Sequence, residues 1–240
     1  MKVLIVHAHP EPQSFTAALK DAAIADLTAA GHEVVVSDLY AMQWNPVASA
    51  ADFGSRGNPE YMNYALEQRA NAEAGTLAAD IEAELAKVMA ADLIIFTFPL
   101  YWFSVPAILK GWFDRVLVSG RVYGGRRFYD QGSLAGKRGW LVLTCGGRDY
   151  MLSEGGIHGD MTQILKPVLQ GTLAYTGLSV LPPFTGYHIP YLSPEKRAEI
   201  LADFRARLAA LDSVEPLAMP VLANYDREMK PLDREMKPLA

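Results

Sequence analysis

The chain has 240 residues, of which 50% are hydrophobic and 20% charged, and its formal net charge is −5 at pH 7. This acidic balance, without any block of Lys and Arg, argues against a nucleic-acid partner, and no apolar run reaches the roughly 18 residues of a membrane span. The first residues read as a strand rather than a signal peptide. The single Cys145 allows no internal disulfide, so we expect a reducing, cytoplasmic location.

The first part of the chain reads as a βαβ unit followed by a long connection. We expect a strand, a helix and a second strand over Lys2–His7, Phe15–Ala30 and Glu33–Asp38. The following segment, Leu39–Gly75, is polar and irregular. A connection of this length in a compact domain is usually functional or forms an interface.

The segment Phe96–Arg115 organises the rest of the chain. The apolar run Asp92–Phe98 predicts a fully buried parallel strand. Three adjacent aromatic residues follow at Tyr101–Phe103, and then a helical pattern for which Ser104 is the N-cap candidate. Aromatic side chains in a loop at a solvent-facing edge suit stacking on a flat ligand, although one face of such a loop can also pack into the core.

The remaining elements continue the alternation of strands and helices. We expect helices over Ala79–Met89, Met161–Thr172 and Pro194–Leu211, and strands over Trp140–Thr144 and Leu178–Leu181. The pattern predicts an α/β fold, a flavodoxin-like doubly wound five-stranded parallel sheet in the order 2-1-3-4-5.

We expect one flavodoxin-like domain over residues 1–216 and a short tail over residues 217–240. In this tail Asp226–Leu232 is repeated as Asp233–Leu239. Two copies of seven residues are too few for a repeat fold, so we expect an exposed and dispensable tail.

Three loops should meet beyond the carboxyl ends of the strands, where ligands bind in open α/β sheets. His9–Thr16 ends in hydroxyls at a helix N-terminus, which suits an anion, although a plain N-cap by Ser14 explains it equally well. Pro99–Phe103 supplies the aromatic side chains, and Thr144–Gly147 supplies glycines that let backbone approach a ligand. Together they describe a site for a nucleotide with a flat ring, and a flavin fits best.

Longer motifs extend this pattern over residues 2–216. They are Val3–Pro10, Ser37–Met42, Ala91–Phe96, Pro99–Phe103, Val105–Phe113 and Gly156–Asp160. These motifs resemble those of the NAD(P)H:quinone oxidoreductases of the DT-diaphorase type. The resemblance implies a homodimer with bound FAD that reduces quinones by two electrons, with NAD(P)H and quinone taking turns in a ping-pong cycle. No metal site is predicted.

The resemblance also implies roles for individual residues. The cofactor-binding set is His9, Ser14, Phe15, Thr16, Asn63, Pro99, Leu100, Tyr101, Trp102, Phe103, Thr144, Cys145, Gly146, Gly147 and Arg197. Within this set, Asn63 is expected to reach the adenosine part from the partner subunit. The substrate pocket is formed by Trp102, Phe103, Tyr123, Gly125, His158 and Tyr175. We further predict His158 and Tyr150 as the catalytic pair, which would stabilise or protonate the charge that hydride transfer creates. Tyr150 is not carried over from the family; it is a residue of this chain that would compensate for a family tyrosine missing from the same loop.

Some positions depart from the family pattern. Leu152 stands where the resembling enzymes have a tyrosine near the flavin, and Gly125 replaces a second pocket tyrosine. The long C-terminal extension of larger members is also missing, which leaves the hydride donor open.

Two other functions remain open from the sequence. One is a flavodoxin-like electron carrier with FMN, and the other is a non-catalytic flavin-binding dimer. The physiological quinone and the choice between NADH and NADPH are not determined by these residues.

Overall fold

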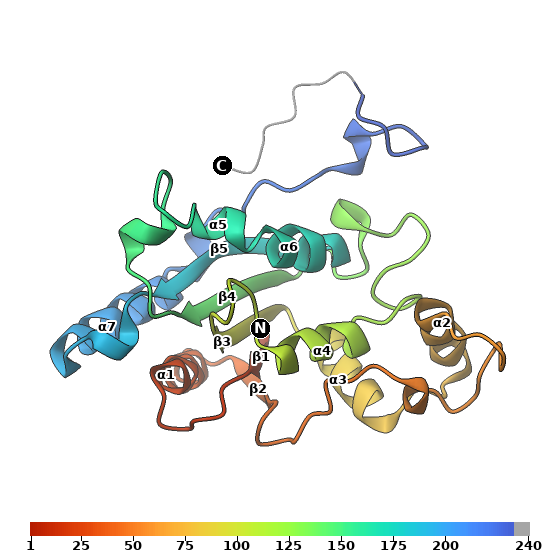
Figure 1. Ribbon diagram of the computed structural model, residues 1–240, viewed down its shortest axis with the longest axis horizontal. Helices are drawn as coiled ribbons and strands as arrows, with labels where there is room; N and C mark the ends of the chain where they lie inside the picture. The colour runs from red at the N-terminus through yellow and green to blue at the C-terminus, as the bar shows by residue number, and fades with distance from the viewer. Residues whose placement is uncertain (233–240) are drawn as a thin grey trace.

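The computed structural model describes residues 1–232, so the second copy of the repeated heptad, Asp233–Leu239, lies outside the described residues (Figure 1). Five parallel strands form one sheet in the order β2-β1-β3-β4-β5. They are β1 (Lys2–His7), β2 (Glu33–Asp38), β3 (Leu93–Pro99), β4 (Arg138–Thr144) and β5 (Ser179–Gly186). The predicted fold class and strand order are confirmed.

Helices cover both faces of this sheet, as the near-continuous apolar strands require. On one face lie α1 (Phe15–Ala29) and α7 (Pro194–Ala209), and on the other lie α3 (Ala79–Ala90), α4 (Ala107–Val116), α5 (Met161–Ile164) and α6 (Lys166–Val168) (Figure 1). Alternate residues of each central strand enter the two cores, so Val3 and Ile5 pack under α1 while Leu4 and Val6 pack on the other face.

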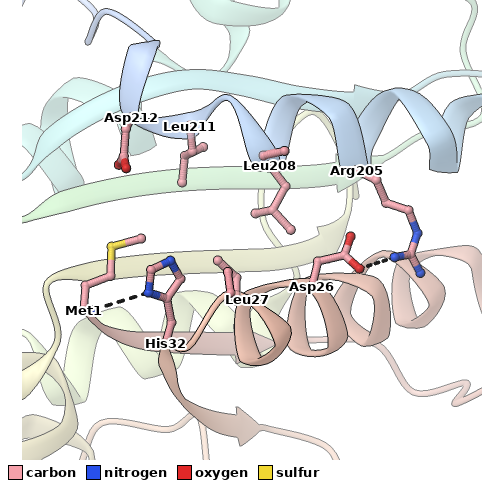
Figure 2. Close-up of a pocket in the computed structure, with 10 residues that line it drawn as sticks. Met1, Asp26, Leu27, His32, Arg205, Leu208, Leu211 and Asp212 are labelled. Carbon is pink, nitrogen blue, oxygen red and sulfur yellow. Dashed lines mark hydrogen bonds and ion pairs between the residues drawn. The ribbon is translucent and has the colours of Figure 1, made fainter.

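The α1–α7 layer leaves a small hollow at the amino edge of the sheet (Figure 2). Its volume is about 210 Å³, and the side chains of Leu27, Leu208 and Leu211 form its apolar floor. An ion pair between Asp26 and Arg205 joins the two helices at its rim. This hollow lies at the opposite edge of the sheet from the predicted ligand site.

The long connection Leu39–Gly75 contains a helix that the sequence did not reveal, α2 (Tyr64–Ala74). Three of its four buried positions are polar, namely Glu67, Gln68 and Asn71, and the fourth is the small Ala72, so no hydrophobic periodicity marks it. The Glu67 carboxylate accepts hydrogen bonds from the backbone N–H groups of residues 57 and 58, at 2.7 and 3.1 Å. Hydrogen bonds to buried polar side chains, rather than packing of an apolar face, therefore attach the rest of the connection to this helix.

Two other elements differ from the sequence prediction for reasons of backbone chemistry. The expected helix Met161–Thr172 is broken into α5, α6 and a π-helical turn over Leu169–Leu173, because Pro167 cannot continue a regular helix. β5 runs to Gly186 and includes two consecutive prolines, which an edge strand tolerates.

Part of the tail packs on the domain. The N–H of Leu217 donates to Val180 O at 2.8 Å, and the N–H of Leu222 donates to Asp130 Oδ1 at 2.8 Å. Leu222 is buried, whereas Asp226–Leu232 forms a mostly exposed turn around the Asp226 carboxylate. Within residues 1–232, no helix combines the length and apolarity that crossing a membrane demands.

Candidate functional site

The three loops that follow β1, β3 and β4 line one cavity of about 320 Å³ at the carboxyl edge of the sheet. Its lining comprises His9, Ser14, Phe15, Thr16, Pro99, Leu100, Tyr101, Thr144, Cys145, Gly146, Ile189 and Pro190. The Thr16 and Thr144 hydroxyls lie 2.7 Å apart, and the Leu100 N–H donates to Thr144 O at 2.8 Å. These bonds tie the loops together, so the predicted convergence is confirmed.

Trp102 and Phe103 form the tip of a tight turn. The N–H of Tyr101 donates to Ser104 O and the N–H of Ser104 donates to Tyr101 O, both at 3.0 Å. The φ angles of Trp102 and Phe103 are 48° and 59°, as in a type I′ turn, where Asn and Gly are the usual residues. The predicted N-cap by Ser104 is wrong, because this residue closes the turn and α4 begins at Ala107 after Pro106.

This turn is strained and exposed at the same time. Each bulky residue in the left-handed region costs roughly 1–3 kcal/mol, and Trp102 exposes 95% of its surface. A folded chain gains nothing internally from holding a large aromatic residue in that way. The turn therefore presents flat apolar surface to something outside the chain.

Free backbone donors occur both in this turn and in the loop after β4. Within residues 1–232, the N–H groups of Trp102, Phe103, Gly146 and Gly147 find no acceptor. At the start of α1, Ser14 Oγ accepts the Ala17 N–H at 3.0 Å, which confirms the N-cap and leaves the first N–H groups of the helix free. Aromatic faces, free backbone donors and a helix N-terminus fit the ring and the phosphates of a flavin nucleotide.

His9 adds a further donor to the same cavity. Its Nδ1 accepts the Glu11 N–H at 3.0 Å, so in the neutral ring the hydrogen lies on Nε2. Burial lowers the pKa of His9, an effect that Glu11 partly opposes. At neutral pH the ring is therefore uncharged and can donate from Nε2.

The loop over residues 149–160 carries the predicted catalytic pair and brings His158 near the aromatic turn. The rings of Phe103 and His158 lie 5.2 Å apart, and Tyr150 exposes 64% of its surface. No hydrogen bond joins Tyr150 to His158 among the contacts of the described chain. Leu152 is buried, and a Cβ on Gly147 would lie only 3.0 Å from its side chain. Leu152 is therefore a packing residue and offers no hydroxyl to the site.

Tyr123 and Tyr175 lie elsewhere in the chain. Their rings are 5.7 Å apart, and Phe128 stacks on Tyr175 at 5.4 Å. The two tyrosines line a separate cavity of about 620 Å³ beside α2 and α4. In Figure 1 the loop over residues 118–136 lies at the right and the loop over residues 145–160 at the left, so one chain does not unite the predicted substrate pocket.

Sequence reasoning missed two members of this second aromatic cluster. Phe128 and Tyr129 both contact Tyr175, with ring centroids 5.4 and 5.6 Å apart. Their adjacency after a Gly-Gly-Arg-Arg stretch was the available signal. The other predicted member, Gly125, has a φ of 63° and is exposed, so it shapes the loop beside the cluster.

Two predicted cofactor ligands have local partners. Asn63 is exposed and accepts the Leu66 N–H at 3.3 Å as the N-cap of α2. Arg197 donates twice to Leu192 O, at 3.1 and 2.9 Å. Neither residue lines the cavity described above, and their cofactor roles stay predictions.

Comparison with known proteins agrees with this geometry. Residues 1–211 match the family described as the flavodoxin-like fold. The chain is 45% identical to NAD(P)H dehydrogenase (quinone) 1 of Rattus norvegicus over 226 residues, which cover 94% of this chain and 82% of that protein. It is also 45% identical to ribosyldihydronicotinamide dehydrogenase (quinone) of Homo sapiens over 225 residues, which cover 93% and 96%.

A solved structure from Klebsiella pneumoniae, named as a quinone reductase, superposes with a TM-score of 0.91 at 38% identity and covers 100% of this chain and 98% of its own. The class is thus a flavodoxin-like oxidoreductase. More narrowly, the chain belongs to the NAD(P)H:quinone oxidoreductase family that its motifs indicated.

Proposed function

We propose that this protein binds FAD and uses NAD(P)H to reduce quinones by two electrons in a ping-pong cycle. The observation that carries the proposal is the strained, exposed Trp102–Phe103 turn, which follows Tyr101 at the wall of a cavity that Gly146 also lines, together with the free N–H groups of Gly146 and Gly147. The names of the relatives, which are NAD(P)H and ribosyldihydronicotinamide dehydrogenases of quinones, support the same reaction.

The chain's own residues divide the work. A bound flavin supplies the hydride acceptor and donor. Ser14, Thr16 and the N-terminus of α1 hold its phosphates, and the aromatic turn supports its ring. The free N–H groups of Gly146 and Gly147 would supply hydrogen-bond donors that stabilise negative charge on the bound ring. His158, in contact with Phe103, would stabilise or protonate the charge that hydride transfer creates.

We further propose that the active enzyme is a homodimer whose two chains share each site. The aromatic cluster around Tyr123 and Tyr175 lies apart from the flavin site in one chain. Its cavity has the exposed apolar residues Tyr61, Met62 and Leu66 on the neighbouring segment. A closed two-fold pairing would cover this surface and bring the tyrosines of one chain over the turn of the other.

Mixed dimers test this arrangement. Trp102→Ala and Tyr175→Ala damage the two halves of the site separately, so each homodimer should be impaired. If the halves come from different chains, a mixed dimer has one intact site out of two. Activity should therefore rise when the two variants are unfolded, mixed and refolded together. Absence of any recovery, or a monomer that turns over normally, contradicts the shared site.

The cofactor and the donor are tested directly on purified protein. We expect a yellow protein that releases about one FAD per chain on heating, and turnover of quinones with parallel double-reciprocal lines. NADH, NADPH and dihydronicotinamide riboside are compared as donors. A folded colourless protein that takes up no FAD, or one that binds FMN and turns over no quinone, contradicts the proposal. The cytoplasm is its proposed location, in line with the single, buried and unpaired Cys145.

A further inference from the structure

His188 makes hydrogen bonds to the loop after β4 that contains Gly146 and Gly147. Its ring Nδ1 lies 3.1 Å from Gly146 O, and its backbone N–H donates to Gly147 O at 2.8 Å. The next residue, Ile189, donates its N–H to Cys145 O at 3.1 Å. Since a carbonyl oxygen only accepts, the ring contact requires the hydrogen on Nδ1. Three successive carbonyls are therefore fixed in a loop whose glycines would otherwise leave it free.

These contacts decide where the neighbouring N–H groups point. In a trans peptide unit the C=O and the N–H point in opposite directions. The Cys145 carbonyl shares its unit with the Gly146 N–H, and the Gly146 carbonyl shares its unit with the Gly147 N–H. Both carbonyls are held on the side of His188 and Ile189. Both N–H groups therefore point away from that side, and neither meets an acceptor within residues 1–232.

The backbone of His188 is unusual in a way that fits this role. Its φ and ψ are 57° and 21°, in the left-handed region that few residues other than Gly and Asn adopt. The ring lies 4.8 Å from that of Tyr191, and the following residues Ile189 and Pro190 line the flavin cavity. A strained residue whose ring and backbone both grip one ligand-facing loop points to a functional constraint.

We propose that His188 is a positioning residue of the flavin site. Its Nδ1–H fixes the peptide between Gly146 and Gly147, so that the Gly147 N–H is already oriented to donate to the flavin ring when reduction places negative charge there. A donor that needs no reorganisation stabilises developing charge more than a mobile one. The inference rests on the proposed flavin site and adds the residue that orders its backbone.

Three variants test it. His188→Gly removes the ring without penalising the left-handed backbone, and His188→Asn keeps a side-chain donor on a residue that tolerates this backbone. Gln43→Gly is the matched control, since Gln43 also has a positive φ of 51° but is exposed in a turn outside the site. Loss of one hydrogen bond predicts that flavin binds the His188→Gly apoprotein about 3- to 10-fold more weakly, as measured by fluorescence titration.

The bound flavin's midpoint potential is the second measurement. It should become more negative in His188→Gly, because the reduced form loses an ordered donor, and His188→Asn should recover most of both effects. Gln43→Gly should match the wild type. Unchanged affinity and potential in His188→Gly, or a loss that His188→Asn does not recover, overturns the inference.

A wild-type protein that neither takes up flavin nor reduces a quinone refutes the proposed function instead. The flavin-free protein then still tests the positioning role through the Gly147 amide resonance. We expect this resonance to move in His188→Gly and to return in His188→Asn. The same resonance position in all three proteins overturns the inference.

Discussion

Trp102 offers the most direct test at the scale of one residue. Its side chain is almost fully exposed, so Trp102→Ala should leave the thermal stability of the flavin-free protein nearly unchanged. Loss of the stacking surface removes a burial contribution of about 1–3 kcal/mol, so the dissociation constant for flavin should rise roughly ten-fold or more. Trp102→Phe keeps a ring and should lie between the two. Titration of the apoproteins with FAD measures the series, and equal affinity for all three would show that the ring does not stack there.

His158 and Tyr150 test the proton step at the same scale. A well-placed general acid contributes about 10²–10⁴-fold. We expect His158→Ala to slow flavin reduction by the low end of this range or less, because buried Leu152 supplies no relaying hydroxyl. Tyr150 has no hydrogen bond to His158 in the described chain, so the losses in Tyr150→Phe and His158→Ala should multiply in the double variant. Stopped-flow reduction by NAD(P)H measures them. A double variant no slower than His158→Ala would instead indicate a relay. A wild-type rate of flavin reduction in His158→Ala would remove the histidine from the mechanism and leave charge stabilisation to the backbone donors.

At the scale of an element, Arg115 joins α4 to the long connection. Its guanidinium donates to Asp52 at 2.9 Å, to Asp80 at 2.7 Å and to Asn45 O at 3.0 Å, and both Arg115 and Asp52 are buried. Burial raises the pKa of Asp52, but hydrogen bonds from Arg115 and Tyr64 outweigh it, and the pKa is lowered overall. The carboxylate thus depends on these partners.

Arg115→Met should therefore lower the free energy of unfolding by about 3–5 kcal/mol, because it leaves a buried carboxylate unpaired. The matched control on the same helix is Lys110→Met, which removes an exposed ion pair with Asp114 and should cost at most about 0.5 kcal/mol. Urea unfolding of both variants measures the difference. Similar small losses in the two would mean that the network does not hold the connection.

His7 makes β1 sensitive to pH. Its ring is buried and lies 2.7 Å from the Thr97 hydroxyl on β3, and burial lowers its pKa to about 4. Between pH 6.5 and 4 the unfolded chain therefore binds a proton that the folded chain does not, so stability falls as the pH falls. The lowered pKa corresponds to about 3 kcal/mol lost by pH 4. Urea unfolding at pH 7 and pH 4 measures how far the free energy of unfolding falls between the two pH values. This fall should be smaller in His7→Gln than in the wild type by about the same amount. An equal fall in the two proteins would contradict the prediction.

At the scale of the whole molecule, the tail should contribute in two unequal parts. Removal of Asp226–Ala240 should leave stability and flavin content near normal, because the described part of that segment is mostly exposed. Removal of all residues after Glu215 also deletes Leu217 and buried Leu222, which bond to β5 and to the loop beside the second aromatic cluster. That longer truncation should lower the melting temperature by several degrees. Scanning calorimetry compares the two, and a clear loss on the shorter truncation would show that the heptads support the domain.

The sequence by itself determined the sheet, its strand order and the three loops at its carboxyl edge. Those features depend on local chemistry, such as the apolar run before Pro99, the Ser14 cap and the aromatic cluster at Tyr101–Phe103, and periodicity reports such chemistry directly. The family motifs lie in the same segments. This is why the fold and the site near Thr144 were predictable without coordinates.

Only the tertiary structure decided the rest. α2 stays hidden in the sequence because most of its buried side chains are polar, and Gln68 has partners that are distant along the chain. Its Nε2 donates to Asp114 O at 3.0 Å, and its Oε1 accepts the Ser119 N–H at 3.2 Å. The left-handed turn at Trp102 contains no Gly or Asn that would predict it from the sequence. The hydrogen bond from His188 to Gly146 joins residues that are 42 positions apart. The separation of Tyr123 from the flavin cavity is likewise a fact of three-dimensional packing. Local propensity carries no information about partners that are far apart in the sequence. These features therefore depend on contacts that only the folded chain forms.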